Sequence, residues 1–260
     1  MDLGLRDRVA VVTGSSSGIG YACAEELARE GARVVLCARN APRLEAAVEL
    51  LQTSAGVGPE RVLAEVADVT RPDDVAKLVQ RAYAGFGTVD ILVTNAGGPK
   101  PGSFADLEVE DFENAVQLNL MGAIRFTHAL LPRMVEQGWG RIVHLTSVSI
   151  RQPIDQLTVS NTVRSAFLGF TRSLATEFAK HNVLVHNVCP GDTRTERLRH
   201  LEEHLARTQN TTPERVRAGW ESMIPAGRLA DPKEIAAVVA FRCSERAGYM
   251  SGPTIAVDGG

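Results

Sequence analysis

The chain has 260 residues, of which 44% are apolar and 23% charged. That composition is typical of a globular protein, and the length is sufficient for one sizeable hydrophobic core. Its 28 basic and 31 acidic side chains leave a net charge of −3, so no sequence-wide basic field favours nucleic acid or an anionic membrane as a partner.

Short apolar segments of strand length recur along the chain and are rich in Val, Ile and Leu, as strands buried on both faces should be. They cover residues 8–13, 33–37, 62–66, 90–93, 141–145, 183–188 and 254–257. Segments with helical spacing alternate with them, at residues 21–30, 42–52, 72–83, 109–137, 156–180 and 232–243. This alternation predicts a single α/β domain, with a doubly wound parallel sheet and helices on both of its faces.

Residues 194–224 interrupt the alternation. The segment is polar, carries Arg194, Arg197 and Arg199, and adds one aromatic side chain, Trp220. A connection of about 30 residues is long for this fold class, so we predict a flap over the substrate. An exposed pair of polar helices without a substrate role is the alternative.

No apolar run approaches the roughly 20 residues that a membrane-spanning helix needs. The first residues, MDLGLRDRVAVVTG, lack the apolar core and cleavage site of a signal peptide. The four cysteines include no CxxC pair, which argues against a zinc site or a disulfide framework. We therefore expect a soluble, reduced, cytoplasmic protein without a metal.

The first predicted strand continues into a glycine-rich turn, Thr13-Gly14-Ser15-Ser16-Ser17-Gly18-Ile19-Gly20, and a helix follows at once. Glycines at such a turn let the backbone curl tightly and let a pyrophosphate approach the N–H groups of the helix N-terminus. An ordinary glycine-rich turn would look similar. The strand before it and the alternation behind it favour dinucleotide binding.

The GxxxGxG spacing resembles that of the short-chain dehydrogenase/reductase family, and further motifs follow in the family's order over essentially the whole chain. They are Asp68-Val69 after the third strand, Asn95-Ala96-Gly97 after the fourth, Asn119 in the long helix, Ser147 after the fifth strand, Pro190-Gly191 after the sixth with Thr193 and Thr195 behind, and the terminal Val257-Asp258-Gly259-Gly260. The resemblance implies a Rossmann fold. It also implies cofactor contacts by Gly14, Ser16, Ser17, Gly18, Ile19, Gly20, Asp68, Val69, Asn95, Ala96, Gly97, Arg164, Pro190, Gly191, Thr193 and Thr195, with Asp68 at the adenine ring.

The residue after the second strand indicates which dinucleotide is bound. NAD-specific relatives carry a carboxylate there, which accepts from the adenosine ribose, whereas this chain has Ala38-Arg39. A guanidinium can bind a 2′-phosphate bidentately, so we expect NADP(H), with Arg39 as the selecting residue. The alternative is that Arg39 is a solvated charge at the start of the next helix.

The catalytic residues of the family are a Ser, a Tyr-x-x-x-Lys pair on the following helix and a helix Asn. Ser147 and Asn119 match the Ser and the Asn, but Ser160 and Arg164 occupy the places of the Tyr and the Lys. Residues 169–177 match the family without a gap, which supports the alignment. Because residues four apart share a helix face, we expect Ser160 and Arg164 to point at the cofactor together.

These two replacements remove the usual proton donor. An aliphatic hydroxyl is a far weaker acid than a phenol, and a guanidinium cannot relay a proton by losing one. Other candidate donors are His144, His186, Asp155 and an ordered water held by Ser147, Ser160 and Arg164. We expect both histidines to be packed structural residues and Asp155 to be an exposed loop charge, and the residues alone do not choose a donor.

Two functional hypotheses follow. The first is an NADP(H)-dependent oxidoreductase that interconverts a small carbonyl compound and an alcohol, with acyl thioesters as the substrate class implied by 3-oxoacyl-carrier-protein reductases. The second is a non-catalytic dinucleotide-binding sensor or scaffold. Losing a general acid lowers the reaction rate by a factor of about 10² to 10⁴ but still leaves the hydride close to the substrate, so we favour the enzyme.

The resemblance also implies an oligomer, because the family pairs subunits through the segments that match residues 109–137 and 156–180 here. Apolar side chains on more than one face of these segments predict a homotetramer or homodimer.

Overall fold

Seven strands form one parallel sheet in a computed structural model that describes residues 2–260. They are β1 (Val9–Thr13), β2 (Arg33–Ala38), β3 (Val62–Val66), β4 (Ile91–Thr94), β5 (Gly140–Leu145), β6 (Val183–Pro190) and β7 (Thr254–Val257). Their order is β3-β2-β1-β4-β5-β6-β7, and every residue of β1 and β6 is buried. The predicted doubly wound sheet is confirmed, and each strand begins and ends within two residues of its expected bounds.

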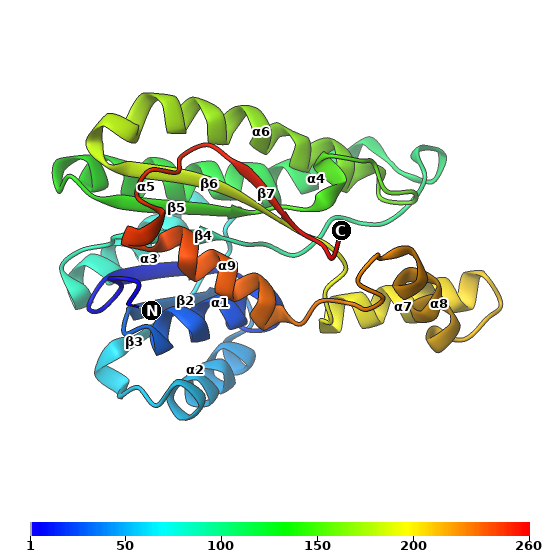
Figure 1. Cartoon of the computed structure of the whole chain (residues 1–260), viewed down its shortest axis with the longest axis horizontal. Helices are drawn as coiled ribbons and strands as arrows, with labels where there is room; N and C mark the ends of the chain where they lie inside the picture. Colours follow the sequence, from blue (N-terminus) through cyan, green and yellow to red (C-terminus); the bar gives the residue numbers. More distant parts are fainter. Residues whose placement is uncertain (1) are drawn as a thin grey trace.

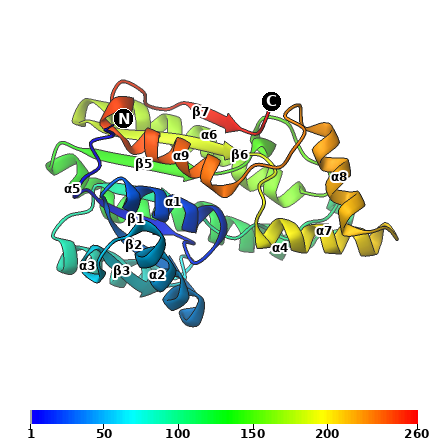
Figure 2. The same cartoon turned by 60° about the horizontal axis from the view of Figure 1, so that its bottom comes forward.

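Helices cover both faces of the sheet (Figure 1). One face carries α1 (Gly18–Arg29), α2 (Ala41–Ala55) and α9 (Pro232–Cys243), and the other carries α3 (Pro72–Phe86), α5 (Gly122–Glu136) and α6 (Thr158–Phe178). Helices α1 and α9 lie side by side (Figure 2), because small buried residues such as Ala24 and Ala236 let them approach closely. Each fully buried Leu or Val of these layers contributes roughly 1.5 to 3 kcal/mol relative to an exposed one.

The long helix expected over residues 109–137 is not continuous. It consists of α4 (Val109–Ala115), a π-helical segment (Val116–Met121) and α5. The π segment widens the helix by one residue per turn, and such segments occur often at functional sites. The helix expected over residues 156–180 is confirmed as α6, followed by a short 3₁₀ turn (Ala179–His181).

Residues 194–224, which we call the lid, form two helices, α7 (Glu196–Thr208) and α8 (Pro213–Met223). They project beyond the carboxyl ends of the strands, as Figures 1 and 2 show. An ion pair at 2.6 Å between Arg217 Nη2 and the buried carboxylate of Glu202 joins α8 to α7. The lid is thus a pair of polar helices, as the alternative interpretation of this segment expects. Its residues also line two cavities, which are described in the next subsection.

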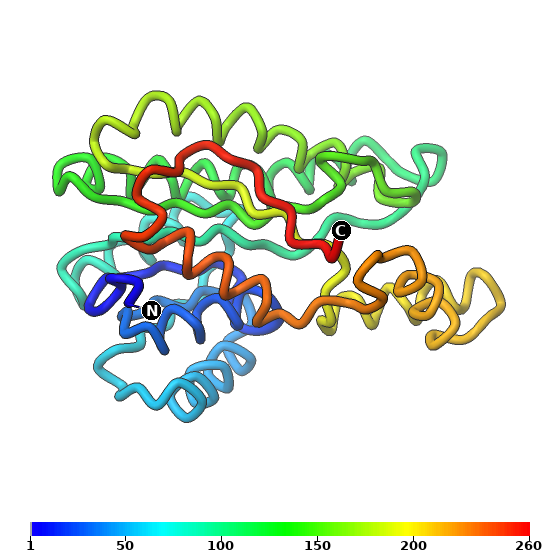
Figure 3. The backbone as a smooth tube through the Cα atoms, in the orientation of Figure 1, coloured from blue at the N-terminus to red at the C-terminus, as the bar shows by residue number. Residues whose placement is uncertain are grey.

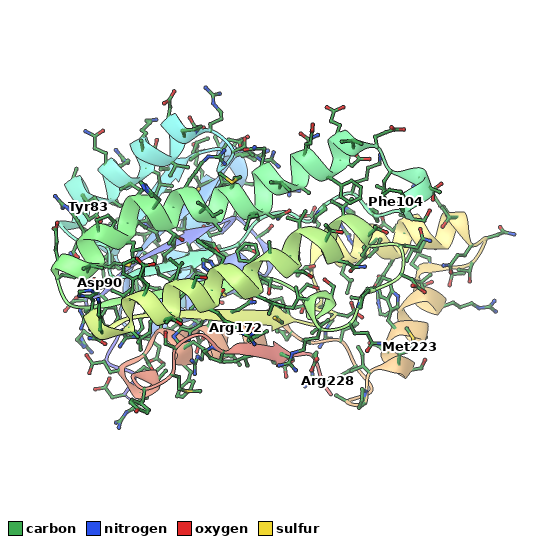
Figure 4. All side chains as sticks on the ribbon, turned by 90° about the horizontal axis from the view of Figure 1, so that it is seen from above. Tyr83, Asp90, Phe104, Arg172, Met223 and Arg228 are labelled. Atoms are coloured by element: carbon green, nitrogen blue, oxygen red, sulfur yellow. The ribbon has the colours of Figure 1, made fainter. Side chains whose placement is uncertain are left out.

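The end of the chain returns beside the lid (Figure 3). The backbone N–H of Ala226 donates to the carbonyl of Gly259 at 3.0 Å, which ties the exit of the lid to the C-terminal segment. In Figure 4, Phe104 and Met223 mark the lid end of the molecule, and Tyr83 and Asp90 mark the opposite end. Residues of the lid and of the glycine-rich turn line one cavity, so both lie at the same end of the sheet.

Three structural observations bear on the wider expectations. No helix within residues 2–260 is long and apolar enough to cross a membrane. Within the same range, no group of three or more His, Cys, Asp or Glu side chains is arranged to hold a metal ion. All four cysteines are free and buried.

Candidate active site

The site begins where β1 separates the two halves of the sheet. β1 pairs with β2 on one side and with β4 on the other, so the connections after β1 and β4 leave in opposite directions and open a crevice. Hydrogen bonds join the two strand ends across this crevice: Thr13 Oγ1 donates to the carbonyl of Asn95 at 2.7 Å, and Asn95 Nδ2 donates to the carbonyl of Gly14 at 3.0 Å. Asn95 therefore holds the glycine-rich turn in place.

The glycines of this turn have different structural roles. Gly14 and Gly18 have φ values of +59° and +58°, which side chains disfavour. A Cβ at residue 14 would also lie 2.8 Å from Asn95 Nδ2, and one at residue 20 would overlap the carbonyl of Gly14. Gly20 thus serves the close packing of α1 on the turn.

A cavity of about 470 Å³ lies in front of this turn, and we call it the dinucleotide cavity. Its volume is within the range of roughly 300 to 1,000 Å³ that is usual for small-molecule sites. Residues expected to bind the cofactor line much of it: Gly14, Ser16, Ser17, Gly18, Ile19, Arg39, Val69, Asn95, Ala96, Gly97 and Thr195. Gly20 and Asp68 do not line it. The positive-φ glycines and the open turn make a cradle that side chains would fill, so these residues fit a dinucleotide diphosphate.

Arg39 lines the cavity end between β2 and β3, where its guanidinium lies 4.0 Å from the carboxylate of Asp68. Burial opposes ionisation of Asp68, but hydrogen bonds from Thr70 and the charges of Arg39 and Arg71 leave its pKa below the usual value. Arg43 also lines the cavity, and its Nη2 forms an ion pair at 2.9 Å with Glu196 of the lid. Sequence reasoning missed this second arginine, which connects α2 to α7 across the cavity mouth.

A second cavity of about 180 Å³ adjoins the first, and we call it the substrate cavity. Ser147, Ser160 and Arg164 line it, as do Pro190, Gly191 and Thr193, which were expected to bind the cofactor. The lid contributes Thr195, Arg197, Leu198 and Leu201 to its wall. The structure therefore brings the hydroxyls and the lid to one place.

Ser147 is placed by the end of β5. Its Oγ accepts a hydrogen bond from the N–H of Ser149 at 3.1 Å, which leaves its own hydrogen available for another acceptor. Ser160, on α6, is only 5% exposed and lies on the same cavity wall. Two hydroxyl groups can thus face a substrate oxygen.

Arg164 lies one turn after Ser160 and also lines the substrate cavity. Its Nη1 donates to the carbonyl oxygens of Leu145 at 3.2 Å and Thr146 at 2.9 Å. Burial, and secondarily the positive charge of Arg197, lowers the pKa of Arg164 to about 10. Ser160 and Arg164 thus line one cavity, and Arg164 is also bonded to the end of β5 beneath it; that both point at the cofactor stays a prediction.

Asn119 lies in the π-helical segment and is held by a 2.9 Å hydrogen bond from its Nδ2 to the carbonyl of Gly97. Its Oδ1 is buried without a partner among the described residues. Asn119 and Arg164 line a small cavity of about 10 Å³, close to the space of one water molecule. The widened helix turn therefore places an amide acceptor beside the arginine.

Two of the alternative proton donors lie in the core. His144 is fully buried between Phe167 and Phe170 and shares a 2.8 Å hydrogen bond with Thr94. His186 is fully buried against Arg242. Neither lines the substrate cavity, which agrees with the expectation that both are structural.

The carboxylic acid of the substrate cavity is Asp192, not Asp155. Asp155 is exposed and is absent from the cavity wall, whereas Asp192 lines it. Burial raises the pKa of Asp192 above its usual value. Sequence reasoning missed this residue, although its position directly after Pro190-Gly191 was a usable signal.

Comparison with known proteins agrees with this architecture. The model of a family described as enoyl-(acyl carrier protein) reductase matches residues 14–260. The chain is 34% identical over 261 residues to 3-oxoacyl-(acyl-carrier-protein) reductase FabG of Aquifex aeolicus (strain VF5), covering 100% of this chain and 99% of that protein. It is 36% identical over 258 residues to oxidoreductase UcpA of Escherichia coli (strain K12), covering 98% and 95%.

A solved structure is similar over the same extent. L-sorbose reductase from Gluconobacter frateurii, complexed with NADPH and L-sorbose, superposes with a TM-score of 0.93 at 36% sequence identity. The match covers 100% of this chain and 98% of that one. The likeness thus includes the lid as well as the sheet.

Proposed function

The chain belongs to the short-chain dehydrogenase/reductase family and is an oxidoreductase of that family, and from this premise we propose that it uses NADP(H) to interconvert a small carbonyl compound and an alcohol through an altered active site. The observation that carries the proposal is the junction of the dinucleotide cavity with a second cavity lined by Ser147, Ser160 and Arg164. A nicotinamide bound in the first cavity would supply the hydride, or accept it in the reverse direction.

NADP(H) is the proposed cofactor because Arg39 lines the dinucleotide cavity where the adenosine ribose is expected. No carboxylate follows β2 directly, since that strand ends at Ala38 and Asn40 caps the next helix. The side chain of Arg39 is 66% exposed, so a 2′-phosphate could reach it. The NADPH in the similar L-sorbose reductase supports the same choice.

Ser147 is proposed to hold the substrate oxygen. Its Oγ accepts from the N–H of Ser149, so its hydrogen can be donated to a carbonyl oxygen that gains negative charge. Ser160 would be a second donor to the same oxygen. Arg164 is proposed as a fixed positive charge beneath them, because its hydrogen bonds to β5 hold it in place.

Asp192 is proposed as the group that protonates the product alkoxide. It is the one carboxylic acid among the residues that line the substrate cavity. A carboxyl whose pKa is raised by burial keeps its proton nearer neutrality and can act as a general acid. A bound NADPH would supply the hydride to the carbonyl carbon, and the Asp192 proton would go to the oxygen, so that atoms and charge balance.

The experiment that tests this function is steady-state turnover with NADPH across ketones, ketoses and β-ketoacyl thioesters. We expect measurable reduction of at least one class, and loss of that activity in Ser147→Ala. NADPH binding without turnover of any class would favour the alternative of a non-catalytic dinucleotide sensor. Absence of binding to either NADPH or NADH would refute both.

A further inference from the structure

Arg197 lies on the first turn of α7 and reaches from the lid into the junction of the two cavities. Five residues line both the dinucleotide cavity and the substrate cavity: Ile19, Asn95, Ala96, Thr195 and Arg197. Arg197 is the one charged residue among them. Its side chain is accessible from both cavities, so a ligand in either could meet its guanidinium.

The position of Arg197 depends on a glycine opposite the lid. A Cβ at residue 98 would overlap the guanidinium of Arg197. Gly98 does not have a positive φ, so its backbone conformation is open to residues with side chains. The missing side chain at residue 98 therefore provides space for the Arg197 guanidinium directly after Asn95-Ala96-Gly97.

Arg197 forms no ion pair within residues 2–260, in contrast to three other arginines of α2 and the lid. Arg43, Arg199 and Arg217 form ion pairs with Glu196, Glu203 and Glu202. Burial lowers the pKa of Arg197, and no carboxylate within residues 2–260 opposes that change. The positive charge of Arg197 also lowers the pKa of Arg164, so the two guanidinium groups lie close enough to repel each other, and Asp192 carries the one carboxyl group on the same cavity wall. An anionic ligand between the cavities would pair with this accessible guanidinium and offset its repulsion of Arg164.

We propose that Arg197 is the cation of an oxyanion-binding site at the junction of the two cavities. A guanidinium presents parallel N–H donors that match two oxygens of a phosphate or a carboxylate. The proposal rests on the proposed function, because two anions could arrive here. One is the diphosphate of the dinucleotide, and the other is a carboxylate on the carbonyl substrate. In both cases Arg197 would join α7 of the lid to the anion.

The test compares the full-length protein with Arg197→Gln, Gly98→Ala and Arg199→Gln. Arg197→Gln removes the charge, and Gly98→Ala leaves the arginine but displaces it by a methyl group. Arg199→Gln is the matched control, since Arg199 is on the same helix, pairs with Glu203 and lines neither cavity. Each variant is first checked for an unchanged melting temperature. NADPH affinity is then measured by fluorescence, and kcat/KM is measured for a 2-oxo acid and for its neutral methyl ketone analogue.

If the diphosphate is the anion, Arg197→Gln and Gly98→Ala weaken NADPH binding by about tenfold or more, while Arg199→Gln does not. If a substrate carboxylate is the anion, NADPH affinity is unchanged and the preference for the 2-oxo acid over the ketone falls by about tenfold or more. Unchanged NADPH affinity together with an unchanged preference would overturn the proposal.

A separate measurement distinguishes this failure from failure of the proposed function. If the unmodified protein binds no NADPH, the oxidoreductase proposal fails, and the oxyanion site is tested alone with inorganic pyrophosphate by calorimetry. Binding that Arg197→Gln weakens by about tenfold would support the site. Binding that Arg197→Gln leaves unchanged, or no binding by the unmodified protein, would refute it.

Discussion

Arg164 Nη1 lies 2.9 Å from the carbonyl oxygen of Thr146, the residue directly before Ser147. The hydrogen bond fixes a positive charge under the hydroxyl that is proposed to hold the substrate. It also commits one guanidinium nitrogen of Arg164 to the backbone instead of to a ligand in the cavity. The chemistry of this cavity should therefore respond to changes at residues 160 and 164 taken together.

If protonation by Asp192 limits the rate, the double variant Ser160→Tyr with Arg164→Lys should raise kcat with NADPH by about 10² or more, with little change in cofactor affinity. A phenol next to an ammonium group can protonate the alkoxide, which an aliphatic hydroxyl cannot do efficiently. Ser160→Tyr alone should give a smaller increase, because Arg164 cannot pass a proton onward. A double variant no faster than a well-active parent would mean that another acid already serves the reaction.

Asp192→Asn should lower kcat for carbonyl reduction by about 10² to 10⁴ if Asp192 is the acid. The protonated form of Asp192 is the active one, so the rate should be highest below its pKa and fall as pH rises through it. Burial raises that pKa from the ordinary value, which moves the falling limb toward neutral pH. Arg164 and Arg197, the charged side chains on the same cavity wall, would oppose this shift by favouring the carboxylate. The pH profile of kcat at saturating NADPH is the measurement, and a falling limb that persists in Asp192→Asn would exclude this role.

NADP(H) should bind at least about tenfold more tightly than NAD(H), because Arg39 can pair with the 2′-phosphate. Arg39→Ala should remove most of that preference. Arg71→Ala is the control, since its exposed guanidinium also lies near the Asp68 region, pairing with Asp74, but does not line the cavity. Fluorescence titration of both reduced cofactors decides the point, and equal affinities for the unmodified protein would reject the assignment of Arg39.

The buried histidines should make the free energy of unfolding fall as the pH drops below about 6.5. Burial lowers the pKa of His144 to about 3 and that of His186 to about 2, with the Arg242 charge adding to the second effect. Below about 6.5 the unfolded chain binds protons at both positions while the folded chain does not, which costs about 1.4 kcal/mol per pH unit for each histidine. Urea unfolding at pH 7.5 and pH 5 measures the slope. His144→Phe should reduce it by one histidine's share, and an identical slope in that variant would contradict the assignment.

The protein should form a homotetramer or a homodimer in solution. Apolar side chains on α5 and α6, including Phe170, Leu174 and Phe178, are only partly buried within one chain. Burying the remaining apolar area between subunits would stabilise an assembly. Light scattering at micromolar concentration should give a mass of at least two chains, and a particle of 28.0 kDa would contradict this.

The sequence by itself determined the sheet, most of the helices and the glycine-rich turn. Strands buried on both faces, such as β1, are nearly continuous apolar runs, and Gly14 and Gly18 mark a turn that side chains disfavour, so local patterns carry this information. The resemblance to the family also pointed to Ser147 and Ser160 as candidate site residues, because they stand where the family has its Ser and its Tyr. These features depend on residues close together in the chain.

Only the tertiary structure decided the contacts between distant segments. The π-helical turn at Asn119 interrupts a continuous helical pattern, and Asn119 bonds to the carbonyl of Gly97 on another connection. Arg164 donates hydrogen bonds to carbonyl oxygens at the end of β5. Asp192, rather than Asp155, lines the substrate cavity. The guanidinium of Arg197, on the lid, lies against Gly98. The packing of the whole fold brings together residues that are far apart in the sequence. The periodicity of a strand (2 residues) or a helix (3.6 residues) does not indicate which distant residues will pair.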